Sequence, residues 1–392
     1  MMKRIVGRFL KGAVLIAFVL SLLFLVGGKP LWAAEPIKIG AVLSITGRGA
    51  FLGQPEKEAI TVVVEEVNRK GGVLGRPIEV YFEDDQSNPT NSATAATKLI
   101  RDKKVSCIIG ASLVVASMAM IPICEREEVA QIGLAPLTIP LKKWIFLGPV
   151  TDYILAQRML KFTVETLGAK KIALLHSSDT YGMNGAQSIM ENLSKFGANV
   201  VITEKFEPAD TNMIPQLTKV KTARADAIIL FANANPAAVI AKNYQQLGMD
   251  IRVVGSGGIP TPDFIKLAGK QAEGGRWILF GCKDQYADQI SPEDPWRKNL
   301  FDPFRKTIKE KYGKTEWNAF YRNGHDAIRA VIEALKIAGK DDRAALRDGL
   351  EKVRFQGFQG DMTYSPTDHD GAKGEAWEPL IIKDGKYSPY RK

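Results

Sequence analysis

The stretch IKIGAVLSITGRGAFLGQPEKEAITVVVEEVNRKGG, residues 37–72, decides the fold. Its first seven residues, Ile37–Leu43, are mostly apolar and predict a buried strand, which ends at the turn-rich segment Ser44–Gly53. Pro55 then predicts the start of a helix, because proline favours the first helical position, and Gly71-Gly72 predicts its end. A buried strand followed by an amphipathic helix is the repeating unit of a parallel sheet.

The same alternation continues along the chain. Further strands are expected at residues 78–82, 105–109, 130–134, 172–176, 200–206, 227–231, 252–254 and 277–280. Intervening helices are expected at residues 91–103, 116–127, 155–167, 183–196, 211–222, 236–247 and 264–267. The pattern restarts after about residue 150. The sequence therefore predicts an α/β fold with two doubly wound parallel-sheet lobes.

The end of the chain has a different pattern. Helices are expected at residues 296–312, 320–338 and 343–353, and strands at residues 357–364 and 380–383. Lys383-Asp384-Gly385-Lys386 is a turn signal. These elements complete both lobes if the chain crosses between the lobes more than once.

The N-terminus is typical of a secretory signal peptide. Lys3, Arg4 and Arg8 precede an apolar run, Ala13–Val26, and Ala33-Ala34 offers small residues for cleavage. The alternative is a permanent membrane anchor, but about 14 residues fall short of the roughly 20 that span a bilayer. We therefore expect residues 1–34 to be removed and the mature protein to be periplasmic or extracellular.

Length and charge exclude several classes of protein. The chain has 392 residues, 45% of them hydrophobic, which suits two domains with separate cores. The net charge of +10 is half contributed by residues 1–34, and their removal leaves 48 basic against 43 acidic side chains, a balance of +5. No basic stripe interleaved with aromatic residues is present, so nucleic acid is not an expected partner.

Cysteine and histidine usage gives no sign of a metal site. Cys107, Cys124 and Cys282 form no CxxC pair, and the three histidines are far apart in the sequence. We expect no metal and no cofactor. A Cys107–Cys124 disulfide and three buried thiols remain equal alternatives.

Three patterns resemble catalytic or cofactor motifs, and each lacks a feature that the motif requires. The glycines of Ser44–Gly53 do not match a dinucleotide fingerprint, and Gly110–Val114 lacks the closing glycine of a nucleophile elbow. Asp84-Asp85 are neighbours at a strand end, so their side chains point apart, and capping of the next helix is the better interpretation. His176 is either a ligand contact or a structural histidine.

Small and hydroxyl residues follow the predicted strands instead: Ser44, Thr46, Ser112, Thr138, Ser177, Ser178, Asn233, Asn235 and Ser256. Ligands of open parallel sheets sit at the carboxyl ends of the strands. Neutral hydrogen bonders beside helix N-termini suit a small carboxylate or polar ligand. This pattern indicates binding without machinery for breaking bonds.

Several blocks, in order, resemble one family. They are IKIGAVL with Thr46-Gly47 and Gly53-Gln54-Pro55, EEVNRKGGVLGR at residues 65–76, Asp179-Thr180-Tyr181-Gly182, FIKLAG at residues 264–269, and the late stretch Gly357–Tyr364. The chain resembles the leucine/isoleucine/valine-binding proteins, solute receptors of ABC importers with the type I periplasmic-binding fold. The resemblance implies a non-enzymatic monomer that closes on a small-molecule ligand like a hinged jaw and delivers it to an inner-membrane permease.

The resemblance also implies lobe boundaries. Three crossovers are expected near Gly148–Asp152, Phe280–Lys283 and Arg354–Gln359. The N-terminal lobe would then comprise residues 35–148 and 283–353, and the C-terminal lobe residues 149–282 and 354–392.

Only some of the family's ligand-contacting residues have a matching residue in this chain. Its ligand-binding serine falls at Val114, close to Ser112 and Leu113, where backbone N–H groups at a helix start remain available. Its second contact loop matches Ala135, Pro136 and either Leu137 or Thr138, and its covering tyrosine matches Tyr181. Strand-end positions Asn235 and Gly257 complete this expected set, and Phe51, Tyr181 and Tyr286 are expected to form apolar walls.

The family's acidic partner for an α-amino group would lie near Gly255–Gly258, where this chain has no carboxylate. A buried ammonium without a partner costs several kcal/mol. Aromatic or aliphatic carboxylates, or amides, therefore compete with amino acids as expected ligands, unless an acid such as Glu207 or Asp284 substitutes. The competing functions are an extracytoplasmic sensor that signals through a partner and a secreted α/β enzyme.

Overall fold

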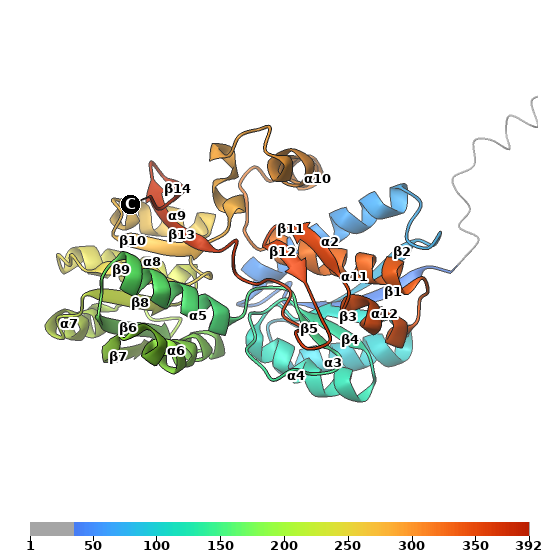
Figure 1. Ribbon diagram of the computed structural model, residues 1–392, viewed down its shortest axis with the longest axis horizontal. Coiled ribbons are helices and arrows are strands. Elements are labelled where there is room, and N and C mark those ends of the chain that lie inside the picture. The colour runs from blue at the N-terminus through green and yellow to red at the C-terminus, as the bar shows by residue number, and fades with distance from the viewer. Residues whose placement is uncertain (1–34, 392) are drawn as a thin grey trace, which may run out of the picture.

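The computed structural model describes residues 35–391, so the expected signal peptide lies outside the described residues. Two sheets with helices on both faces lie side by side and form two lobes (Figure 1). The sheet of the first lobe has the order β2-β1-β3-β4-β5, and its strands all run parallel. Its strands are β1 (Ile37–Leu43), β2 (Ile78–Asp84), β3 (Cys107–Gly110), β4 (Ala130–Gly133) and β5 (Ile145–Leu147).

The second lobe holds a seven-stranded sheet of order β14-β13-β10-β9-β8-β6-β7. Its strands are β6 (Lys171–Ser177), β7 (Asn199–Phe206), β8 (Ala227–Phe231), β9 (Arg252–Gly255), β10 (Trp277–Gly281), β13 (Glu378–Lys383) and β14 (Lys386–Pro389). Strands β6–β10 are parallel, whereas β13 and β14 form an antiparallel hairpin on the edge of β10. The predicted turn at this hairpin is confirmed, because Asp384 and Gly385 both adopt positive φ and join Lys383 to its partner Lys386.

Helices cover both faces of each sheet. The first lobe uses α2 (Ala50–Arg69), α3 (Pro89–Lys98), α4 (Val114–Arg126), α10 (Asp302–Tyr312), α11 (Tyr321–Ala338) and α12 (Arg343–Leu350). The second lobe uses α5 (Asp152–Lys161), α6 (Thr180–Asn192), α7 (Ile214–Thr222), α8 (Ala234–Gln246) and α9 (Pro262–Ala268). Short π or 3-10 turns are η1 (Leu99–Lys103), η2 (Phe162–Thr166), η3 (Leu193–Phe196), η4 (Gly269–Ala272), η5 (Lys283–Gln289) and η6 (Arg297–Phe301).

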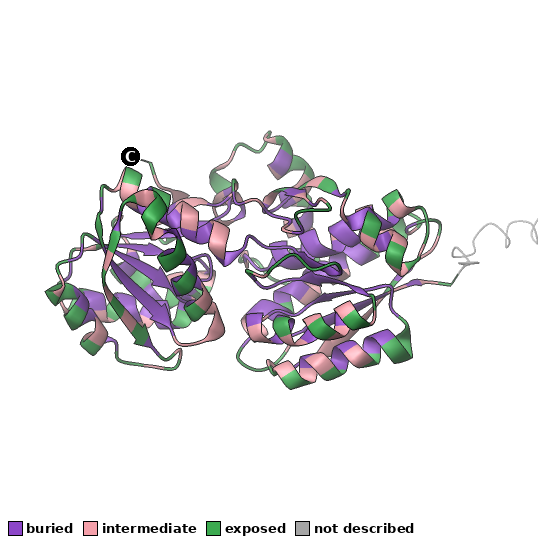
Figure 2. Ribbon diagram, turned by 60° about the horizontal axis from the view of Figure 1, so that its bottom comes forward, coloured by how far each residue is buried: buried purple, intermediate pink, exposed green. Residues whose placement is uncertain are grey.

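The core lies between these layers. Two hydrophobic clusters occupy the two faces of each sheet, and the buried strands run through the middle of each lobe (Figure 2). Near-continuous apolar strands are expected where helices cover a parallel sheet on both sides. The predicted fold class is confirmed.

Helix α2 begins earlier than predicted, at Ala50 instead of Pro55. Proline inside a helix leaves the carbonyl four residues before it without its N–H donor. Here that carbonyl belongs to Phe51, and the Asn318 side chain donates to it at 3.5 Å. A contact from a distant segment thus makes the internal proline acceptable.

The acidic pair after β2 holds the neighbouring loop instead of capping α3. Asp85 accepts a hydrogen bond from the Ser44 hydroxyl at 2.8 Å, and Asp84 accepts from the Ile45 N–H at 3.0 Å. Asn88 caps α3, since its side chain accepts from the Thr90 N–H at 2.8 Å. The predicted capping role of the two aspartates is therefore wrong.

The stretch predicted as one strand at residues 357–364 is a hairpin of β11 (Arg354–Gly357) and β12 (Gly360–Thr363). Its tip turns because Gly360 adopts a φ of +94°, which favours glycine. Phe358 at the tip packs against Trp296, and the buried Asp326 accepts from its N–H at 3.0 Å. The hairpin tip thus packs into the core of the first lobe.

The three cysteines are buried free thiols. Burial raises the pKa of Cys124 to about 12, which keeps it protonated and unreactive. Of the two alternatives, a Cys107–Cys124 disulfide and three buried thiols, the structure shows the three thiols. Within residues 35–391, no helix combines the length and apolar character needed to cross a bilayer.

Candidate ligand-binding site

Two adjoining pockets lie between the lobes, where strands of both sheets end. The inner pocket has a cavity volume of about 80 Å³ and is lined by Leu52, Ser112, Leu113, Val114, Leu134, Pro136, Pro149, Val150, Asp152, Leu155, Tyr181, Asn233, Gly257, Gly258, Phe320, Arg322, Asn323 and Trp377. The outer pocket, of about 470 Å³, is lined by Arg48, Phe51, Leu113, Val114, Val115, Ser177, Asp179, Thr180, Tyr181, Glu207, Pro208, Ala209, Asn233, Ala234, Asn235, Pro236, Thr261 and Asp263. The shared residues make the two pockets one cleft.

The first lobe presents a helix start and a buried hydroxyl to the inner pocket. Helix α4 begins at Val114, and its first N–H groups have no partners within the helix. The Ser112 hydroxyl just before it lies 2.5 Å from Oε2 of the fully buried Glu56. Burial raises the pKa of Glu56 to about 8, so this carboxyl holds its proton at neutral pH. Behind Ser112 this part of the wall is therefore mostly uncharged at neutral pH.

A buried arginine joins the lobes at the back of the inner pocket. Arg322 of α11 is 1% exposed and pairs with Asp284 of η5 at 3.2 Å. Its guanidinium also lies 4.6 Å from the ring centre of Trp377, which belongs to a hydrophobic cluster of the second lobe. Among the described residues, Nε of Arg322 and Nε1 of Trp377 have no hydrogen-bond partner. Two buried donors therefore remain beside the pocket.

Asp152 supplies a carboxylate on the opposite side. It is the first residue of α5, after the cap residue Thr151, and it is fully buried. Neither of its oxygens has a partner within the described chain. Burial, and then the charge of Asp179, raise its pKa well above the ordinary value. A cationic group of a ligand would restore its charge and offset the cost of its burial.

Tyr181 closes the pocket from the second lobe. Its hydroxyl accepts a hydrogen bond from the Gly258 N–H at 3.2 Å, and its ring packs edge-on against Phe231. The loop it contacts requires glycine. A Cβ at Gly257 would lie 2.3 Å from Trp377, and one at Gly258 would lie 3.1 Å from the Tyr181 ring.

Most of the predicted contacts line this cleft. They are Phe51, Ser112, Leu113, Val114, Pro136, Tyr181, Asn235 and Gly257. Ala135 is fully buried in the core beneath the pocket, and the exposed Thr138 accepts from the Tyr153 N–H at 3.3 Å, so neither lines it. His176 is buried, and its Nδ1 lies 2.8 Å from the Ser177 carbonyl oxygen, which fits the structural alternative.

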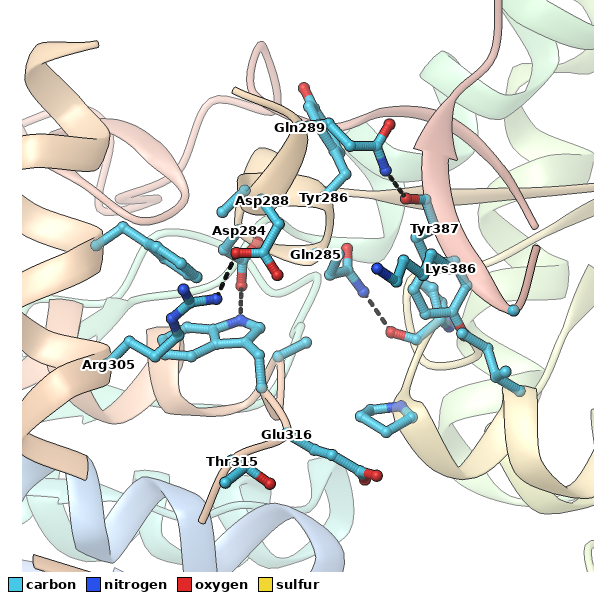
Figure 3. A pocket seen from close by; sticks show the side chains of 18 of the residues that line it. Asp284, Gln285, Tyr286, Asp288, Gln289, Arg305, Thr315, Glu316, Lys386 and Tyr387 are labelled. Atoms are coloured by element: carbon cyan, nitrogen blue, oxygen red, sulfur yellow. Dashed lines mark hydrogen bonds and ion pairs between the residues drawn. The ribbon is translucent and has the colours of Figure 1, made fainter. Parts of the chain in front are cut away.

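Tyr286 lies in a different cavity, which we call the hinge pocket (Figure 3). This cavity of about 390 Å³ is lined by η5, and the Tyr286 hydroxyl bonds to Glu378. Asp284 and Tyr286 both line the hinge pocket, and Asp284 also pairs with Arg322, which lines the inner pocket. An exposed ion pair between Lys266 and Glu316 crosses from one lobe to the other here, at 2.6 Å.

Sequence reasoning missed the charged residues Asp152 and Arg322 of the inner pocket, and it missed Glu56, which lies behind Ser112 and Asn323 of the pocket wall. Asp152 follows a threonine at a helix start, which is typical of ordinary capping. Arg322 begins a long amphipathic helix and gives no local sign of burial. The chain has no carboxylate near Gly257, but Asp152 of α5 brings one to the same pocket.

Comparisons with known proteins agree with this architecture. Residues 36–376 match the model of a family described as "Periplasmic binding protein". The chain is 25% identical over 337 residues to the leucine-, isoleucine-, valine-, threonine- and alanine-binding protein of Pseudomonas aeruginosa, which covers 85% of this chain and 86% of the relative.

Two solved structures share the fold over nearly their whole length. An extracellular ligand-binding receptor of Rhodopseudomonas palustris HaA2 has a TM-score of 0.81 and 27% identity, covering 91% of this chain and 99% of that one. A leucine-binding protein of Thermotoga maritima has a TM-score of 0.75 and 25% identity, covering 91% and 98%. The resemblance to leucine/isoleucine/valine-binding proteins is therefore confirmed, and the chain belongs to the periplasmic binding protein family.

Proposed function

We propose that the chain is the solute receptor of an ABC importer and that it captures a small α-amino acid between its lobes. The observation that carries the ligand class is Asp152, a fully buried carboxyl group that has no partner in residues 35–391 and that lines a pocket beside a helix start. The ligand carboxylate would bind at the first N–H groups of α4 and at Ser112. Its ammonium would pair with Asp152.

The two ends of such a ligand would contact different lobes. Ser112 and Val114 belong to the first lobe, while Asp152 and Tyr181 belong to helices of the second. A ligand held from both sides favours the closed arrangement, because only that arrangement makes both sets of contacts. The relative from P. aeruginosa is named for several small amino acids, which supports this ligand class.

We further propose that the mature protein is exported, works as a monomer and delivers its ligand to a membrane permease. The basic and apolar pattern of residues 1–34 supports export. We place residues 35–148 and 283–353 in the N-terminal lobe and residues 149–282 in the C-terminal lobe. Because Phe358 and Tyr364 pack in the core of the first lobe, we move the third crossover from the expected Arg354–Gln359 to a point after Tyr364, and of the remaining residues only those beyond it belong to the C-terminal lobe.

Calorimetry with matched ligands tests the ligand class. Leucine and 4-methylpentanoate differ only in the α-amino group, as do phenylalanine and 3-phenylpropionate. We expect each amino acid to bind at least tenfold more tightly than its deaminated partner, because only an ammonium offsets the cost of ionising the buried Asp152. Tighter binding of both deaminated acids would refute the proposed ligand class.

Variants identify the residue responsible. Asp152→Asn should remove most of the preference for the amino acid, since the amide carries no charge to pair with the ammonium. Asp263→Asn is the matched control, because this acid lines only the outer pocket. A preference that survives Asp152→Asn unchanged would show that another group holds the ammonium.

A further inference from the structure

The Ser112 hydroxyl has two partners beneath the inner pocket. The Ser44 N–H donates to Ser112 Oγ at 3.1 Å, and Oε2 of Glu56 lies 2.5 Å from the same oxygen. The other oxygen of Glu56 accepts from the Asn323 side chain at 3.4 Å. A serine hydroxyl has one proton to donate and two lone pairs that accept. What Ser112 offers to the pocket therefore depends on which way the proton between Ser112 and Glu56 lies.

Consider first an ionised Glu56. A carboxylate only accepts hydrogen bonds, so the Ser112 proton must point at Glu56. One lone pair of Ser112 then accepts from Ser44, and only the other lone pair remains for the pocket. An anionic ligand would meet an acceptor in front of a buried negative charge. An ionised Glu56 therefore disfavours the binding of a ligand carboxylate at Ser112.

A protonated Glu56 reverses the pattern. Its own O–H donates to Ser112 Oγ, and the Ser44 N–H occupies the second lone pair. The Ser112 proton is then free, and Ser112 lines the inner pocket immediately before the start of α4. The hydroxyl and the backbone N–H groups of the helix start together form a cluster of donors for an anion.

We infer that Glu56 is a positioning residue that acts as a neutral acid and turns the Ser112 hydroxyl toward an anionic group of the ligand. The inference rests on the proposed function, because it assigns the anionic end of the ligand to the start of α4. Glu56 does not touch the ligand. It acts through Ser112, and it makes anion binding depend on a proton.

The surroundings of Glu56 support its neutral state. Burial raises the pKa of Glu56 to about 8, and the nearby charge of Asp85 adds to the effect. On α11, Arg322 is paired with Asp284, and burial lowers the pKa of His325. Across the pocket, Asp152 of α5 also has a raised pKa. Glu56 is therefore mostly protonated at pH 7 and loses its proton above about pH 8.

The test compares wild type with Glu56→Gln, which keeps the protonated pattern at every pH. The glutamine amide N–H donates to Ser112, and its oxygen accepts from Asn323. Leucine and 4-methylpentanoate are the probes, titrated by calorimetry between pH 6 and pH 9.5. The ratio of the wild-type Kd to the Glu56→Gln Kd for one probe cancels the titration of the probe and of Asp152.

We expect this Kd ratio to be near one below pH 7 and to rise about tenfold per pH unit above pH 8, to about 30 at pH 9.5. Ser112→Ala should weaken binding at pH 7 and lose the dependence on Glu56. A merely structural Glu56 would give a constant ratio. A ratio that stays flat from pH 6 to pH 9.5 would overturn the inference.

A second measurement separates this inference from the proposed function. If neither probe binds any variant at any pH, the proposed ligand class fails, and infrared spectroscopy of the unliganded protein still tests Glu56. We expect the carbonyl stretch of a protonated carboxylic acid at pH 7 in wild type and its loss in Glu56→Gln. Absence of that difference band would overturn the inference, whatever the ligand.

Discussion

Arg322 contacts Trp377 of the second lobe and pairs with Asp284 in η5, and breaking this pair is the sharpest test of the hinge. Both side chains are buried, with exposures of 2% and 0%, and they meet at 3.2 Å. Replacing Arg322 by methionine keeps much of the volume but leaves Asp284 as a buried charge. The indole N–H of Trp317 still donates to Asp284 at 2.8 Å, which offsets part of the loss. Breaking a buried pair from one side typically costs about 3–5 kcal/mol.

Contact with Trp377 adds to this cost. The guanidinium of Arg322 lies 4.6 Å from the Trp377 ring centre, a cation–π contact worth about 0.5–2 kcal/mol depending on solvation. We therefore expect Arg322→Met to lower the free energy of unfolding by about 3–5 kcal/mol. The double variant Arg322→Met/Asp284→Asn should recover at least about half of that loss, because it leaves no unpaired charge.

Urea unfolding followed by tryptophan fluorescence measures these differences. Arg305→Met is the matched control, since Arg305 pairs with Asp288 of η5 (Figure 3), but Arg305 is only half-buried and Asp288 is exposed. That pair should be worth no more than about 1 kcal/mol. A cost below 1 kcal/mol for Arg322→Met, or a double variant no more stable than the single one, would refute the reasoning.

Four further outcomes are expected. Because the pKa of Glu56 is raised to about 8 by burial, its contribution to stability is full below about pH 4.5 and is lost as the pH rises to 8. The stability of wild type relative to Glu56→Gln should thus fall by about 1.4 kcal/mol per pH unit in that window, as measured by urea unfolding, whereas a constant difference would contradict the burial. Tyr181→Phe should weaken ligand binding about three- to tenfold in calorimetry, because the Gly258 N–H loses its acceptor; an unchanged Kd would exclude this contact. A thiol reagent should label none of Cys107, Cys124 and Cys282 in the folded protein and all three in urea, and fewer than three in urea without reductant would indicate a disulfide. Small-angle scattering should give a smaller radius of gyration at saturating ligand, and no change would argue for a rigid cleft.

The alternation of strands and helices is a local property, and it was predictable for that reason. Strands β1 and β8 lie where the apolar runs indicated, because helices cover both faces of each sheet and require nearly continuous apolar strands. Boundaries that depend on distant partners were not predictable. Helix α2 extends back to Ala50, where the Asn318 side chain donates a hydrogen bond to the Phe51 carbonyl oxygen. No local sequence pattern reveals that contact.

Some residues of the candidate site were predictable from the sequence, and others depend on tertiary packing. Strand-end positions such as Ser112 and Gly257 follow from the rule that parallel strands present their carboxyl ends to a ligand, and Tyr181 follows from the family resemblance; all three line the inner pocket. The charges of the inner pocket are those of Asp152 in α5 and Arg322 in α11, which meet at the cleft only when the lobes pack together. Asp152, Glu56 and Arg322 gain their chemistry from burial, and burial is set by the tertiary structure. The sequence by itself therefore determined the two-lobed α/β framework and the edge that binds, whereas only the tertiary structure decided which charges face the ligand, because desolvation depends on every segment that packs around a side chain.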